Sequence, residues 1–122
     1  MPQFSTASTP RLKKSPEGIC PGQKEFALVS FAVRLKFAPE DRADIAESLR
    51  LLAAASRKEP GCVSYIPHQV EDDPDTVLIY EQYRDQQALA AHRDTEHFKK
   101  HAVGALYQRM KERSIENLVA LV

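Results

Sequence analysis

The first strong pattern in the chain is an alternation of apolar and polar residues that begins at Phe26. From there to residue 37, apolar side chains fall on one face, and the other face carries Ser30, Ala32, Arg34 and Lys36. The apolar positions are Ala27, Val29, Phe31, Val33, Leu35 and Phe37. This period of two predicts a β-strand that buries one face.

A helical pattern follows this strand. Pro39 suits the first turn of a helix, and Glu40 and Asp41 place negative charge near the positive end of the helix dipole. Apolar residues then recur at helical spacing, which predicts an amphipathic helix of about four to five turns. They are Ile45, Leu49 and Leu52. The Glu-Pro-Gly sequence at 59–61 is expected to end the helix, because proline lacks a donor and glycine tolerates a positive φ.

The remaining chain predicts two more strands, a helical region and a closing strand. Residues 62–70 and 76–83 have the composition of strands, and the short acidic segment between them predicts a hairpin turn. Asp85 and Thr95 are suited to begin two successive helical pieces. A final strand is expected within residues 114–122, which are rich in aliphatic side chains.

The order strand, helix, strand, strand, helix, strand is that of the ferredoxin-like βαββαβ fold of the α+β class. Such a fold has a four-stranded antiparallel sheet with both helices on one face. The other face is then either polar enough for water or covered by a second subunit, and we expect a homodimer. We place this domain at residues 25–122. Residues 1–24 are rich in Ser, Thr, Pro and Lys and predict an irregular arm.

Charge and hydropathy argue against several classes of function. Lys and Arg total 17, as do Asp and Glu, and this zero net charge argues against nucleic-acid binding. We see no apolar run suited to a membrane span or a signal peptide, so we expect no membrane association and a cytoplasmic protein. Cys20 and Cys62 lack the paired spacing of zinc sites, and both are expected to be reduced thiols.

Three short segments carry a family resemblance. They are EPGCVSY at 59–65, YEQYRD at 80–85 followed by ALAAH at 88–92, and TEHF at 95–98. Together they resemble the antibiotic biosynthesis monooxygenase domain, although Tyr83 stands where that family usually has tryptophan. The resemblance covers the chain from about Phe26 to Val122 and leaves out the arm.

The resemblance implies a dimeric α/β barrel with a pocket between each sheet and its helices. It also implies oxidation of a small quinol or aromatic substrate by dioxygen, with no metal or flavin. The family is more distantly similar to haem-degrading monooxygenases, so haem is an alternative cofactor. Two further functions stay open on the same fold, because fold alone does not choose among them. One is an isomerase or degrading enzyme for a small oxidised metabolite, and the other is a non-enzymatic binding module of a stress response.

Oxygenation without a cofactor needs a base, a hydrogen-bond donor for the substrate anion and a dry cavity. His92 is the leading catalytic candidate, because imidazole titrates near neutral pH, and the alternative is a histidine that only packs. Tyr83 and Glu81 share one face of a predicted strand, so Tyr83 could donate to a substrate oxygen that Glu81 orients. The structural alternative for Glu81 is an ion pair with Arg34 or Arg84.

The substrate-binding candidates are Tyr65, Phe98 and Arg34. Tyr65 is expected to share a face of its strand with Val63, and that face meets either the helices or a second subunit. Phe98 is also the expected core anchor of the second helical piece. His68 is expected to face solvent.

His97 and His101 are four residues apart and could chelate a metal ion from one helix face. No third ligand arrives at a convincing spacing, and Lys99 and Lys100 add positive charge between them. We therefore expect a solvated helix face and no metal site. Cys62 has no histidine in an obvious pairing position and is expected to be a buried, inert thiol.

Overall fold

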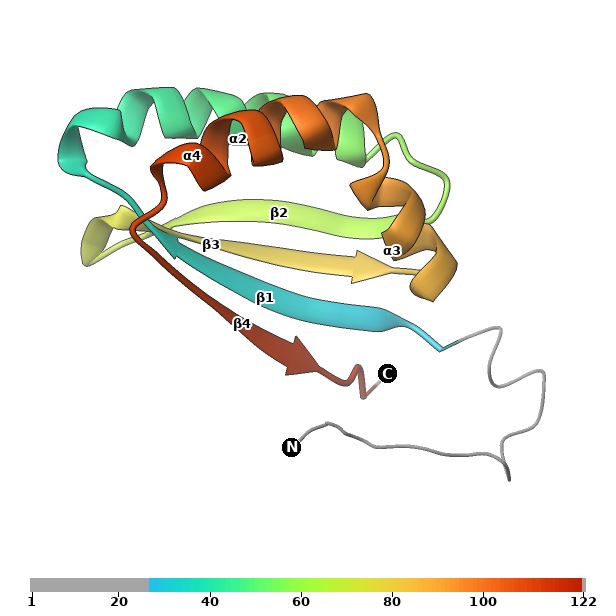
Figure 1. Cartoon of the computed structure of the whole chain (residues 1–122). Helices are drawn as coiled ribbons and strands as arrows, with labels where there is room; N and C mark the ends of the chain where they lie inside the picture. Colours follow the sequence, from blue (N-terminus) through green and yellow to red (C-terminus); the bar gives the residue numbers. More distant parts are fainter. Residues whose placement is uncertain (1–26, 122) are drawn as a thin grey trace.

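The computed structural model describes residues 27–121, in which a sheet carries a layer of helices (Figure 1). The strands are β1 (Val29–Lys36), β2 (Cys62–Val70), β3 (Asp73–Tyr83) and β4 (Glu112–Leu118). The helical elements are η1 (Pro39–Asp41), α2 (Arg42–Ser56), α3 (Gln86–Arg93), the π-helical η2 (Phe98–Leu106) and α4 (Tyr107–Arg109). The arm predicted for residues 1–24 lies outside the described residues.

The strand order is β2-β3-β1-β4, and each neighbouring pair is antiparallel. α2 carries the chain from β1 across to β2 at the sheet edge, which leaves the place between them for β3. Figure 1 shows α2, η2 and α4 on one face of the sheet and no helix on the other. The predicted ferredoxin-like α+β fold is therefore confirmed.

The core fills the space between the sheet and the helices. The alternating apolar side chains of β1 face the apolar stripe of α2, as the two periodicities predict. Their buried members are Phe31, Val33 and Leu35 from β1 and Ile45, Leu49 and Leu52 from α2. Burial of each such side chain stabilises the fold by roughly 1.5–3 kcal/mol relative to exposure.

The two predicted helix starts are confirmed by side-chain hydrogen bonds. The Asp85 carboxylate accepts from the backbone N–H of Ala88 at 2.8 Å, which caps α3. The Thr95 hydroxyl accepts from the backbone N–H of Phe98 at 3.2 Å and donates to the carbonyl of His92 at 2.7 Å. Thr95 therefore joins the end of α3 to the start of the next helical piece.

Several strand boundaries differ from the prediction. β1 starts at Val29, and β4 runs over Glu112–Leu118 rather than 114–122. β3 starts at Asp73 rather than at residue 76. The extra residues of β3 are stabilised by ion pairs, because Asp73 lies 3.1 Å from the Lys36 ammonium.

A β-bulge changes which side chains of β2 share a face. Cys62 is opposite Tyr83 and Ser64 is opposite Gln82, so Val63 is an extra residue in the ladder. Val63 is 53% exposed, whereas Tyr65 is buried on the helix side. The expectation that these two residues share a face is therefore wrong.

Gly61 is required for close packing rather than for a positive φ. A Cβ atom at Gly61 would overlap the Cβ of Ala88, and the φ angle of Gly61 is outside the left-handed region. The Gly61 carbonyl also accepts from the backbone N–H of Arg84 at 2.9 Å. The turn after α2 therefore docks directly on the end of β3 and on α3.

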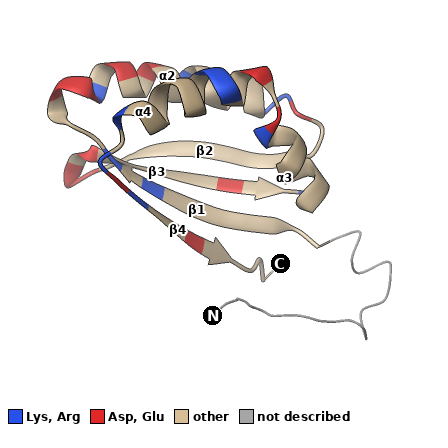
Figure 2. Ribbon diagram, viewed as in Figure 1, with Lys and Arg blue, Asp and Glu red and all other residues tan. Residues whose placement is uncertain are grey.

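Charged residues gather on the helical layer and on the β2–β3 turn, whereas β2 carries none (Figure 2). Within residues 27–121, no helix is both long enough and apolar enough to span a bilayer.

Replacing Gly61 with alanine should lower the free energy of unfolding by roughly 1–3 kcal/mol, because the new methyl group overlaps Ala88. Gly104→Ala is the matched control. Its Cβ would meet the Lys99 carbonyl at 3.2 Å, and the higher helix propensity of alanine offsets this contact. Urea unfolding measures both variants, and equal losses of stability would contradict the packing role of Gly61.

Candidate functional site

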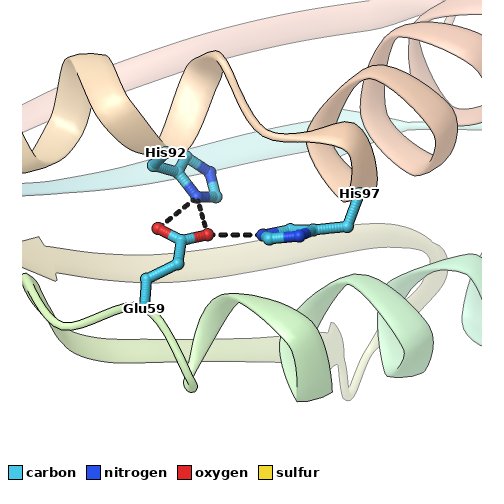
Figure 3. Close-up of side chains that lie close together, drawn as sticks. All are labelled: Glu59, His92 and His97. Carbon is cyan, nitrogen blue, oxygen red and sulfur yellow. Dashed lines mark hydrogen bonds and ion pairs between the residues drawn. The ribbon is translucent and has the colours of Figure 1, made fainter.

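The candidate site lies where the α2–β2 turn, α3 and the C-terminal half of β3 meet. Figure 3 shows the Glu59 carboxylate between the rings of His92 and His97. Glu59 comes from the turn, His92 from α3 and His97 from the residues just before η2. Two neighbouring histidines thus meet a carboxylate that is 33 and 38 residues away in the sequence.

Glu59 accepts hydrogen bonds from both imidazole rings. The Nδ1 atom of His92 lies 2.9 Å from Oε2 and 3.2 Å from Oε1. The Nε2 atom of His97 lies 2.5 Å from Oε2. A carboxylate can only accept, so in a neutral His92 ring the proton sits on Nδ1 and Nε2 carries the free lone pair.

The local backbone holds Glu59 in place. Its N–H donates to the Ser56 carbonyl at 3.0 Å, and its carbonyl accepts from the N–H of Cys62 at 3.1 Å. On the other side of the carboxylate, the Thr95 hydroxyl closes the break between α3 and η2, which brings His97 beside His92. The turn and the helix break are therefore the two local structures that build the site.

Glu81 and Tyr83 form a second hydrogen-bonded pair below the His92 ring. The Tyr83 hydroxyl donates to Oε1 of Glu81 at 2.7 Å, and the Nε2 atom of His92 lies 4.0 Å from the same oxygen. Both residues face the helices, where Tyr83 is completely buried and Glu81 is 7% exposed. Within residues 27–121, Glu81 makes no ion pair with Arg34 or Arg84, and its partners are the Tyr83 hydroxyl and the more distant His92 ring.

Burial sets the protonation states of this group. It raises the pKa of Glu81 to about 7, although the Tyr83 hydrogen bond opposes the shift. It lowers the pKa of His92, although the hydrogen bond to Glu59 opposes that shift. Burial and the neighbouring Glu81 carboxylate also raise the pKa of Tyr83 far above its usual value. At neutral pH, His92 is therefore uncharged, Glu81 can hold or release a proton, and Tyr83 is a hydrogen-bond donor.

Aromatic rings surround His92. The ring centroid of His92 lies 5.7 Å from that of Tyr65, 5.1 Å from that of Tyr83 and 5.1 Å from that of Phe98. Tyr65 faces the helices, which settles the question left open by the sequence. These rings exclude water from the imidazole and give it apolar surroundings.

Some predicted residues lie elsewhere. Arg34 is exposed on the face of β1 that carries no helix, because its neighbours in the alternation fill the core. His68 is exposed as predicted. His97 is not part of a solvated face, because it turns toward Glu59, and His101 stands outside the group.

A cavity of about 570 Å³ lies at the opposite end of the helical layer. It is bounded by the first half of α2 and by the ends of β2 and β3 next to their turn, and its lining includes Arg42, Leu49 and His68. Neither His92 nor Tyr83 lines it. Tyr83 is completely buried, so this cavity is separate from the residue that was expected to donate to a substrate oxygen.

Glu59 is the site residue that sequence reasoning missed. Its turn was interpreted only as a chain reversal, and the ring partners of its carboxylate are 33 and 38 residues away. One signal was available. Each of the three segments that carry the family resemblance contributes one member of the group, namely Glu59, His92 and His97.

Among the described residues, Glu59, His92 and His97 form a group that could hold a metal ion. One ligand atom from each of Glu59, His92 and His97 lies within 4.8 Å of the others. Cys62 is close in sequence but does not belong to it. Cys62 is half-buried rather than buried as expected. Burial and the nearby carboxylates of Glu59 and Glu81 raise the pKa of its thiol to about 11, which agrees with the expected inert thiol.

Comparison with known proteins identifies relatives of the whole described domain. A family model described as "Antibiotic biosynthesis monooxygenase" matches residues 29–103. No curated protein sequence matches the chain.

Solved structures also match this chain over most of its length. A Pseudomonas aeruginosa protein is 31% identical, with a TM-score of 0.72, over 80% of this chain and 98% of its own. A Bacteroides thetaiotaomicron protein of unknown function, described as a "Possible Oxidoreductase", is 26% identical with a TM-score of 0.71, over 78% of this chain and 99% of its own. A second protein of that organism, a "Putative antibiotic biosynthesis monooxygenase", is 25% identical with a TM-score of 0.73, over 79% and 91%.

Proposed function

The chain belongs to the antibiotic biosynthesis monooxygenase family, and we propose that it oxidises a small quinol or related aromatic substrate with dioxygen, without a cofactor. The observation that carries the proposal is the tautomer and orientation of the His92 ring. Its Nδ1 atom is held by Glu59, and its Nε2 atom points into an aromatic, water-poor region 4.0 Å from Glu81. A neutral imidazole oriented in this way accepts a proton at Nε2.

In the proposed reaction, His92 removes a proton from the substrate hydroxyl. The resulting anion is electron-rich and reacts with dioxygen, so that a quinol and dioxygen give a hydroxyquinone and water. Tyr83 supplies a hydrogen bond to the substrate oxygen when Glu81 is protonated and releases it. The pKa of Glu81, which burial raises to about 7, lets this carboxyl group take and return a proton at neutral pH.

The uncovered edge of the sheet is the proposed route for the substrate. All residues of β4 are exposed, and Figure 1 shows no helix above this strand. Only β1 separates β4 from the strand that carries Glu81 and Tyr83. The Arg113 guanidinium lies 5.8 Å from the centre of the Tyr107 ring at this edge, so an aromatic substrate would meet an aromatic ring and a cation there.

A homodimer is part of the proposal. The sheet face without helices presents Ile66 at 42% exposure and Leu118 at 40%. Tyr80 lies opposite Ile66 in register, and Leu118 lies opposite Ser30 of β1. A second copy would cover these apolar side chains, and the zero net charge of the chain gives no long-range repulsion between copies. We place the protein in the cytoplasm, where the thiol of Cys62 would stay reduced.

A second candidate function requires proton transfer but no dioxygen. His92 and Glu81 are two groups that exchange protons on either side of one small region, which suits an isomerase of a small oxidised metabolite. Such an enzyme would not consume dioxygen. Oxygen consumption therefore separates the two candidates, and it also separates both from a protein that only binds its ligand.

The first test is oxygen uptake with a panel of hydroquinones in metal-free buffer. The wild-type protein should consume oxygen above the uncatalysed rate, and His92→Ala should lower turnover by about 10²-fold or more, because the base is lost. Tyr83→Phe should lower turnover through loss of its hydrogen bond. His68→Ala, at an exposed position, is the matched control and should keep full turnover.

The proposal fails if no aromatic substrate raises oxygen uptake, or if both site variants turn over as fast as wild type. A haem titration accompanies the assay. A shift of the Soret band on mixing would favour the haem-degrading alternative.

Static light scattering tests the dimer. The wild-type protein should show about twice the chain mass of 13.7 kDa, and Ile66→Asp should shift it toward the monomer by placing a charge on the apolar face. Leu51→Asp is the control, since Leu51 is 47% exposed but lies on α2 in the helical layer. A monomeric wild type, or equal behaviour of the two variants, would contradict the proposed interface.

A further inference from the structure

We propose that Glu59, His92 and His97 bind one divalent transition-metal ion of the Zn²⁺ class. Two imidazole nitrogens and one carboxylate oxygen are a ligand set that such ions prefer, and they commonly leave a fourth position for water. The three ligand atoms already lie within 4.8 Å of one another. They come from a turn and two helical segments that hydrogen bonds hold together.

The distances require only a small adjustment. Zinc lies about 2.0–2.2 Å from nitrogen and oxygen ligands, so its ligand atoms stand about 3.4 Å apart in a tetrahedral site. Oε2 of Glu59 is now 2.9 Å from Nδ1 of His92 and 2.5 Å from Nε2 of His97. A retreat of the Glu59 carboxylate by about 1 Å would bring these two distances to that value, and rotation of its side chain can supply the movement. The two imidazole nitrogens lie within 4.8 Å of each other, and rotation of the partly exposed His97 side chain can adjust that distance.

The surroundings of His92 give a second, independent argument. A histidine that binds a metal through one nitrogen usually donates its other N–H to a carboxylate, which fixes the ring. Oε1 of Glu81 lies 4.0 Å from the Nε2 atom of His92, and the Tyr83 hydroxyl holds that carboxylate at 2.7 Å. Glu81 thus lies on the Nε2 side of the ring, and an approach of about 1 Å would let it accept that N–H and orient His92 as a metal ligand.

An ion can reach this site from one side. The side chains of His97 and Glu59 are 22% and 13% exposed, whereas His92 is 2% exposed. The outer part of the group therefore touches solvent, which provides both an entry path and the water for the fourth position. His92 forms its inner wall.

Metal binding would change the chemistry of His92. An ion on Nδ1 moves the ring proton to Nε2, so that this nitrogen donates to Glu81 and no longer accepts a proton from a substrate. Zn²⁺ is therefore expected to inhibit the oxygenation proposed above. This consequence rests on the proposed function, whereas the binding itself does not.

Calorimetric titration of the untagged, EDTA-treated full chain with Zn²⁺ tests the proposal. We expect one ion per chain, and Co²⁺ in its place should give the visible absorption of a four-coordinate site. Glu59→Gln and His97→Ala should each weaken binding at least about tenfold through loss of a ligand, and Glu81→Gln should weaken it by about 10–100-fold through loss of the orienting carboxylate. His101→Ala and His68→Ala are the matched controls and should bind as wild type does.

The absence of stoichiometric binding would overturn the proposal, as would an equal loss of affinity in His97→Ala and His101→Ala. Because His97 is partly exposed, its replacement leaves the core intact, and unfolding measurements on the same samples check this. Oxygen uptake in metal-free buffer is a separate readout. A protein that binds no zinc but oxidises quinols would refute only the metal site, and a protein that binds zinc but consumes no oxygen would refute only the monooxygenase.

Discussion

The Glu59 carboxylate, held between two imidazole rings, is the interaction on which the functional end of the molecule depends. It joins the α2–β2 turn to α3 and to the residues before η2, which no backbone ladder connects. It also decides which nitrogen of His92 carries the proton, because a carboxylate accepts and does not donate. The orientation and tautomer of the buried His92 ring therefore follow from one side chain, whereas burial lowers the pKa of the ring and keeps it uncharged.

Burial shifts the pKa values of Glu81 and His92, and it also carries an energetic cost. A carboxyl group at 7% exposure would normally be costly to ionise, and Glu81 is tolerated because the Tyr83 hydroxyl satisfies one of its oxygens. The result is a carboxyl group whose pKa lies at about 7 beside a histidine whose pKa is lowered. Structural packing and the proposed proton transfer thus use the same residues, and the aromatic rings around His92 keep water out.

Much of the fold followed from periodicity and caps, since the alternation in β1, the stripe of α2 and the caps at Asp85 and Thr95 are local patterns. The errors arose where distant contacts decide. Gly61 looked like a positive-φ residue, but its contact with Ala88 is the constraint. The bulge at Val63 could not be seen without its partner strand.

The residues of the candidate site also differ in how far the sequence predicts them. His92, Tyr83 and Glu81 could be proposed from their motifs and strand face, whereas Glu59 joins them only through the folded chain. Nuclear magnetic resonance of the ¹⁵N-histidine-labelled, metal-free protein at neutral pH tests this account most directly. We predict that His92 carries its proton on Nδ1 in wild type, and that Glu59→Ala loses this preference. A wild-type His92 protonated on Nε2, or a tautomer unchanged in Glu59→Ala, would contradict it.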